Sequence, residues 1–138
     1  MWSRCLSIHW TPGSAAFETN VLPVANRRGI AVLGMKSMGG SGELISQGAF
    51  TPSEALSYAM TLPVATTISG IDSMEVLDQN LAILRDFKPF SADQMQTLRD
   101  HGKQFNDGRY ELYKSTLKYD SDLGRSQHGF PSSAELPL

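Results

Sequence analysis

The sequence predicts an α/β fold in which buried parallel strands alternate with amphipathic helices. Three observations predict it: two short apolar runs typical of strands buried on both faces, a helix-start signal after each run, and a length of 138 residues that suits one core. Parallel strands joined by helices pair through right-handed crossovers. Because two strands leave edges and faces uncovered, the local pattern is that of a piece of a larger α/β fold.

The composition indicates a soluble globular chain, with 41% hydrophobic and 19% charged residues. A net charge of −2 argues against nucleic acid and an anionic membrane as partners, because no basic field exists. No apolar run approaches the length that spans a bilayer, and no signal peptide is predicted. The single cysteine excludes an internal disulfide and a cysteine-clustered metal site. We therefore expect a cytoplasmic protein without a bound metal.

The chain begins irregularly and then becomes periodic. Residues 1–16 show no period of two or of 3.6, and we expect a disordered tail there. Residues 17–28 carry a helical apolar stripe, in which Pro23 predicts a kink or a late start and Gly29 predicts the end. The continuous apolar run at residues 30–36 predicts the first buried strand.

A glycine-rich loop and a strongly signalled helix lead to the second strand. Thr51 is a good N-cap, and Glu54 three residues later completes a capping box. Pro63 ends this helix. The β-branched run at residues 65–71 predicts the second buried strand.

Two more helices and an extension complete the predicted order. Asp72 with Glu75, and Ser91 with Gln94, have the spacing of capping boxes at helix starts. In the first of these helices the side chains expected to face inward are Val76, Leu77, Leu81 and Leu84. Residues 106–138 are polar and aperiodic, and we interpret them as a C-terminal extension. Their tyrosines show no spacing that pairs one of them with a lysine on a rigid element.

Four stretches, taken in this order and spacing, form a recognisable set: "GIAVLGMKSMGG", "TPSEALSYAMTLP", "TTISGIDSMEVLDQNLAIL" and "FSADQMQTL". Together they resemble the C-terminal portion of the aldo/keto reductases. The resemblance implies a partial (β/α)8 TIM barrel that holds the last two parallel strands with their flanking helices. The expected organisation is an unmatched tail at 1–16, the barrel portion at 17–105 and the extension at 106–138.

The resemblance also implies that NADPH or NADH binds in extended form at the C-terminal ends of both strands. Met35 takes the place where the family often has an aromatic residue that stacks on the nicotinamide ring. Lys36 is expected to answer a pyrophosphate charge, and the glycines after it allow close approach of the backbone. The cofactor residues predicted at this strand end are Met35, Lys36, Ser37, Met38 and Gly39.

The second strand end is expected to receive the adenosine part of the cofactor. Backbone N–H groups after Gly70 would point toward a phosphate at a helix N-terminus. Asn80 matches the position that hydrogen-bonds adenine in the family. Gly70 and Val76 stand where many NADPH-binding members carry basic residues, so NADH and NADPH both stay open. The cofactor residues predicted here are Gly70, Ile71, Asp72, Ser73, Gln79 and Asn80.

The tyrosine, lysine, aspartate and histidine that perform the family's chemistry have no counterpart in the matched region, so no catalytic residue is predicted. The sequence thus predicts a truncated NAD(P)H-dependent aldo/keto reductase, an oxidoreductase fragment that is inactive unless another chain completes the barrel. One alternative is a non-catalytic fragment that associates with itself or a partner chain through its exposed edges. Another is a reading frame whose product does not fold stably.

Overall fold

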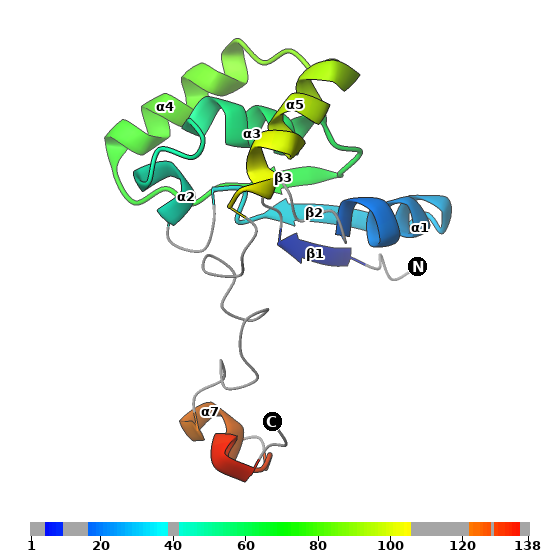
Figure 1. Ribbon diagram of the computed structural model, residues 1–138, viewed down its shortest axis with the longest axis vertical. Coiled ribbons are helices and arrows are strands. Elements are labelled where there is room, and N and C mark those ends of the chain that lie inside the picture. The colour runs from blue at the N-terminus through cyan, green and yellow to red at the C-terminus, as the bar shows by residue number, and fades with distance from the viewer. Residues whose placement is uncertain (1–4, 10–16, 39–41, 106–121, 128, 136–138) are drawn as a thin grey trace.

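The protein is described by a computed structural model that covers residues 5–9, 17–38, 42–105, 122–127 and 129–135. At its centre lies a three-stranded parallel sheet with the order β1-β2-β3 (Figure 1). The strands are β1 (Cys5–His9), β2 (Ala31–Met35) and β3 (Thr66–Ile68). Sequential parallel order requires a crossover connection between each pair of neighbouring strands.

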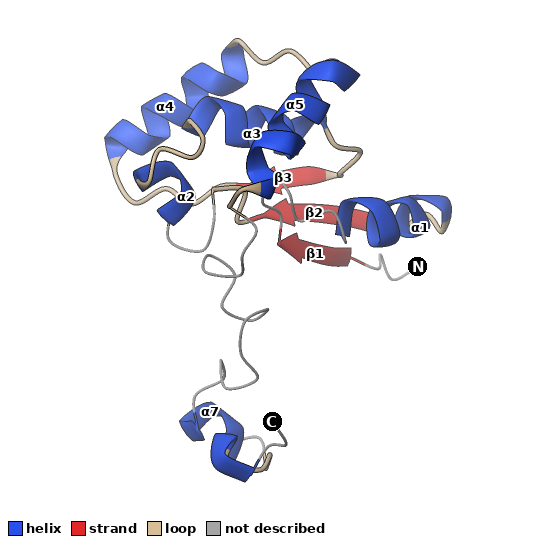
Figure 2. Ribbon diagram, viewed as in Figure 1, coloured by secondary structure: helices blue, strands red, loops and turns tan. Residues whose placement is uncertain are grey.

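Helices supply these crossovers and continue after the last strand (Figure 2). The π-helix η1 (Phe17–Val21) and helix α1 (Leu22–Arg27) precede β2, and helices α2 (Glu43–Ser46) and α3 (Pro52–Thr61) precede β3. Helices α4 (Met74–Arg85) and α5 (Ala92–Lys103) follow β3. Helix α7 (Asp122–Gln127), which lies apart from the sheet in Figure 1, and the 3-10 helix η2 (Ser133–Glu135) end the described chain.

The two faces of the sheet differ in how well they are covered. On β2, Val32 is 1% exposed and Gly34 is buried, whereas Leu33 and Met35, which point to the opposite face, are only half-buried. Met35 is in register with Ile68 of β3, which is 45% exposed. One face therefore carries the core, and the other leaves apolar side chains partly open.

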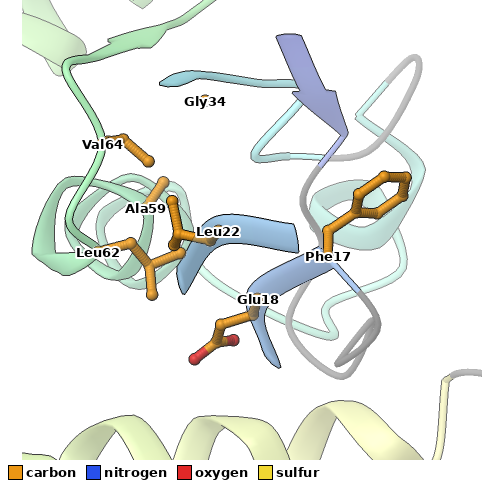
Figure 3. A pocket seen from close by; sticks show the side chains of 7 residues that line it. All are labelled: Phe17, Glu18, Leu22, Gly34, Ala59, Leu62 and Val64. Atoms are coloured by element: carbon orange, nitrogen blue, oxygen red, sulfur yellow. The ribbon is translucent and has the colours of Figure 1, made fainter. Parts of the chain in front are cut away.

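The core under the covered face joins α1, β2 and the end of α3. Leu22, Ala25 and Val32 form its buried centre. Figure 3 shows the side chains of Leu22, Leu62 and Val64 gathered around a small hollow. Its volume is about 10 Å³, about the smallest that holds a water molecule, so the hollow is too small for a larger ligand.

A partly buried polar cluster ties η1 to α3 and α5. The hydroxyl of Tyr58, which is 0% exposed, donates to Glu18 Oε2 over 2.8 Å. Arg99 pairs with Glu18 Oε1, donating from Nε over 3.0 Å, and its guanidinium lies 5.7 Å from the centroid of the Tyr58 ring. Figure 3 shows the Glu18 carboxylate turned away from the apolar hollow, toward a neighbouring helix. Each polar group of the cluster therefore has a partner, whereas burying the Tyr58 hydroxyl or the Glu18 carboxylate without one would destabilise the fold.

Aromatic contacts fix the far end of α5. The His101 ring lies edge-on to Phe50 at a centroid distance of 5.2 Å and to Phe105 at 5.4 Å. His101 Nε2 hydrogen-bonds the carbonyl of Ala49 over 2.8 Å. His101 is therefore a packing residue that holds α5 against the segment before α3.

Most predicted helix boundaries agree with the structure. The capping boxes of Thr51 with Glu54 and of Ser91 with Gln94 are both present. Helix α1 starts late, with Pro23 in its first turn, and Gly29 follows it in the left-handed region at φ 66°. At that φ a side chain would be strained, which explains the glycine. The parallel pairing of the two predicted strands is also confirmed.

The partial (β/α)8 TIM barrel predicted from the sequence is wrong. The described residues form a small α/β fold with one open sheet. A barrel closes only when strand number, tilt and stagger agree around the whole ring. Here the third strand, β1 at residues 5–9, comes from the segment expected to be a tail, and β3 contains only three residues.

Two local predictions on α4 also fail. Its N-cap is Ser73, whose hydroxyl accepts from the N–H of Val76, so the expected box of Asp72 with Glu75 is absent. Leu84, expected to face inward, is 59% exposed. Helix α4 has no fully buried residue, so it packs loosely against the rest of the fold.

Replacing Tyr58 with Phe tests the polar cluster. Burial, followed by the hydrogen bond to Glu18, raises the pKa of the Tyr58 hydroxyl. A raised folded-state pKa means that the neutral phenol stabilises the fold below its ordinary pKa of about 10, and that this stability is lost as the pH rises through the folded value.

We expect Tyr58→Phe to lower the free energy of unfolding by about 1 kcal/mol at pH 7, measured by urea unfolding. Between pH 9 and 11 the wild type should lose stability faster than the variant. Equal pH dependence of the two proteins would contradict the assigned role of Tyr58.

Candidate functional site

A groove of about 960 Å³ opens at the carboxyl edge of β2 and β3. The two strands run in the same direction, and the N–H of Ala65 donates to the carbonyl of Val32 over 2.8 Å. Their C-terminal ends therefore meet at one edge of the sheet, which is where open α/β sheets bind ligands. The turn after β2, helix α2, the start of α3 and the corner between β3 and α4 complete the walls.

The β2 side of the groove is lined by the thioether of Met35 and the ammonium group of Lys36. Met35 ends the strand half-buried, and Lys36 follows it exposed to solvent. Lys36 has a φ of 54°, in the left-handed region that a lysine rarely adopts. Ser37 is then only 3% exposed, so the chain turns sharply at Lys36 and puts the next side chain inside. This turn leaves the lysine at the groove wall.

The β3 side is apolar with one acid. Ile68 and Ile71 are 45% and 56% exposed, and both line the groove. Asp72, also exposed, is the last residue before the cap of α4. Val76 and Gln79 line the groove from the first turns of α4. Because a three-residue step in a helix keeps side chains on one face, the amide of Gln79 lies beside Val76.

The start of α4 is capped by its own side chains. Ser73 Oγ accepts from the N–H of Val76 over 3.2 Å. The N–H of Glu75 itself and then the hydroxyl of Ser73 lower the pKa of the Glu75 carboxyl, so Glu75 stays ionised at neutral pH. The helix N-terminus thus carries a fixed negative charge and part of its donors are already engaged.

Asn80 does not line the groove itself, but it hydrogen-bonds Ser69, which does. Its Nδ2 donates to Ser69 Oγ over 3.2 Å. Its Oδ1 is buried and, within the described residues, has no hydrogen-bond partner, as is true of Thr67 Oγ1. Asn80 therefore ties α4 to the end of β3.

Eight of the eleven residues predicted to bind the cofactor line this single groove. They are Met35, Lys36, Ser37, Met38, Gly70, Ile71, Asp72 and Gln79. Gly39 lies outside the described residues. Ser73 and Asn80 do not line the groove: Ser73 caps α4, and Asn80 hydrogen-bonds Ser69 in the turn after β3.

Sequence reasoning missed the wall contributed by the connection between β2 and α3. Ile45 and Ser46 of α2 and Pro52 at the start of α3 line the groove. The position of Pro52 could have been predicted. Pro52 opens a helix with clear start signals, and a helix that connects two parallel strands begins near the end of the first strand, here β2. The position of α2 could not be predicted from the length of the connection between β2 and α3.

Lys36 and Asp72 are the charged residues among the described groove lining, and no tyrosine or histidine occurs in that lining. Tyr110, Tyr113, Tyr119 and His128 lie outside the described residues, whereas His101 packs elsewhere. The described residues also hold no group of three or more metal-ligating side chains. The groove therefore combines apolar surface with one cation, Lys36, and one acid, Asp72.

A scan against protein-family models, a search of curated proteins and a search of solved structures each find no match for the chain. The resemblance to the aldo/keto reductases therefore stays a prediction from the sequence. Among the helices described here, none combines the length and the apolar character that crossing a membrane requires.

Replacing Lys36 with Gly tests whether the turn stores strain at the groove. The left-handed conformation costs an L-residue about 1–2 kcal/mol, and glycine avoids that cost. We expect Lys36→Gly to raise the free energy of unfolding by about 1 kcal/mol, measured by urea unfolding, and Lys36→Ala to give no gain. A Lys36→Gly variant no more stable than Lys36→Ala would show that the turn is unstrained.

Proposed function

We propose that the groove binds a nicotinamide cofactor, NADH or NADPH, and that the chain is part of an NAD(P)H-dependent aldo/keto reductase. One observation carries the proposal: parallel β2 and β3 bring two sequence-distant turns, each predicted to contact this cofactor, to the same groove. The cofactor-binding part of the proposal requires only the edge of this open sheet.

The groove offers separate surroundings for the parts of such a ligand. Lys36 supplies a cation for a diphosphate. Met35 and Ile68, in register on neighbouring strands, supply apolar surface for a ring. Gln79 supplies an amide that donates and accepts hydrogen bonds, as the edge of adenine requires.

The chain by itself is proposed to bind the cofactor without reducing a carbonyl compound. Hydride transfer to an aldehyde or ketone needs an acid that protonates the forming alkoxide, and the described groove lining holds no tyrosine or histidine for this role. A second chain that completes the site would supply that acid. We place the protein in the cytoplasm, in keeping with its single cysteine.

Titration of the purified chain with NADH, followed by nicotinamide fluorescence, tests the proposal. We expect saturable binding, weakened about tenfold by Lys36→Ala, because a charge-assisted contact contributes about 1.4 kcal/mol or more. Lys88→Ala removes an exposed lysine outside the groove lining and should leave the affinity unchanged.

Absence of saturable binding, or equal weakening by both substitutions, would contradict the proposed site. The same preparation, mixed with NADPH and a small aldehyde, should consume no cofactor above background. Turnover by the isolated chain would overturn the inactive part of the proposal while leaving cofactor binding intact.

A second candidate function is association with another copy of this chain, as a non-catalytic fragment. Large apolar side chains stay exposed on β3, at the corner after it and along α4: Ile68, Ile71, Met74 and Leu84, at 45%, 56%, 65% and 59%. Exposed apolar side chains concentrated on neighbouring elements are typical of interaction surfaces. The edge strand β3 (Thr66–Ile68) carries no charge or proline that would discourage pairing.

Analytical ultracentrifugation over a range of concentrations distinguishes this candidate. Self-association predicts a dimer that the double substitution Met74→Ser and Leu84→Ser returns to monomer. These residues are more than half exposed, so their replacement leaves the core unchanged. A wild-type monomer at every concentration would remove this candidate.

A further inference from the structure

The two charged residues of the groove follow different strands and have opposite signs. Lys36 follows β2, and Asp72 follows β3 at the corner before α4. The remaining described lining residues are uncharged. A bound anionic group is therefore attracted to one side of the groove and repelled from the other.

The β3 side is negative for two independent reasons. Asp72 does not cap α4, because Ser73 does. Within the described part of the chain, Asp72 also has no hydrogen bond or ion pair. Glu75 adds a second carboxylate in the first turn of α4, kept ionised by its own N–H and by Ser73. Both carboxylates oppose the favourable field that a helix N-terminus would otherwise offer to a phosphate.

The same side carries the groups that suit a nucleoside without an added phosphate. Gln79 lines the groove with its side-chain amide, three residues after Val76 on the same face of α4. A carboxylate next to a dinucleotide accepts hydrogen bonds from ribose hydroxyls, which is how many such sites recognise a free 2′-hydroxyl. A 2′-phosphate at that place loses these bonds and meets the charge of Asp72.

We propose that Asp72 makes this groove selective for NADH over NADPH by accepting from the free 2′-hydroxyl of the adenosine ribose and repelling a 2′-phosphate. This proposal rests on the cofactor site proposed above and adds the residue that sets its preference. Lys36 then faces the diphosphate that both cofactors share, so it contributes to affinity and not to the choice between them.

Parallel titrations with NADH and NADPH at low ionic strength, followed by nicotinamide fluorescence, test the preference. We expect wild-type protein to bind NADH about tenfold more tightly than NADPH. Asp72→Asn should reduce this ratio, mainly by strengthening NADPH binding. Asp86→Asn changes an exposed carboxylate at the opposite end of α4 and should leave the ratio unchanged.

A variant expected to bind NADPH more tightly provides a second test, because a loss of binding alone could also come from misfolding. Apart from its two chain neighbours, no atom of the described residues lies within 4 Å of the position that a Cβ at Gly70 would take, so Gly70→Lys has room for a cation on this side. It should shift the preference toward NADPH. Because each ratio is measured within one variant, a change in the folded fraction cancels.

The outcomes separate the two proposals. Equal or tighter binding of NADPH by the wild type, or a ratio that Asp72→Asn leaves unchanged, overturns the role of Asp72 while the cofactor site stands. If the wild type binds neither cofactor, the site itself is refuted, and the preference is refuted with it.

Discussion

The parallel pairing of β2 with β3 is the constraint on which the rest of this structure depends. Leu33, Gly34 and Met35 are in register with Thr66, Thr67 and Ile68. Parallel pairing obliges α3 to cross back over one face of the sheet, and the same geometry delivers both strand ends to one edge. Lys36 and Asp72, 36 positions apart in the sequence, therefore reach one groove.

The strand pairing is stabilised by helices packed on the covered face of the sheet, whereas the elements beside the groove are less buried. Helix α3 is fully engaged, with Tyr58 hydrogen-bonded to Glu18 and packed beside Met95 of α5. Helix α4 has no fully buried residue, and Asn80 hydrogen-bonds Ser69 in the turn after β3. A firm scaffold next to a less buried wall is a common property of ligand sites, because binding elements come from the less stable parts of a fold.

The sequence predicted what depends on neighbouring residues. The caps at Thr51 and Ser91, the late start imposed by Pro23 and the end of α1 at Gly29 are set within a few residues, and each was predicted correctly. Two apolar runs with helices between them also sufficed to predict parallel strands. Eight groove residues followed, because strand ends of a parallel pair must share an edge.

What failed depends on choices that local sequence does not make. Asp72 and Ser73 are both good N-caps, so the start of α4 was misplaced by one residue. Asn80 turned toward Ser69 because the rotation of α4 over β3 is decided by packing. The barrel prediction failed because closure is a property of a whole ring of strands, whereas the sequence pattern marked only two strands.

Amide NMR spectra of the labelled chain, recorded while NADH is added, test the central claim most directly. If the paired strand ends form one ligand site, the resonances of residues 35–38 and 69–72 shift together along a single binding curve. Shifts confined to one of these segments, or located away from both, would contradict the claim that the β2–β3 edge is the site.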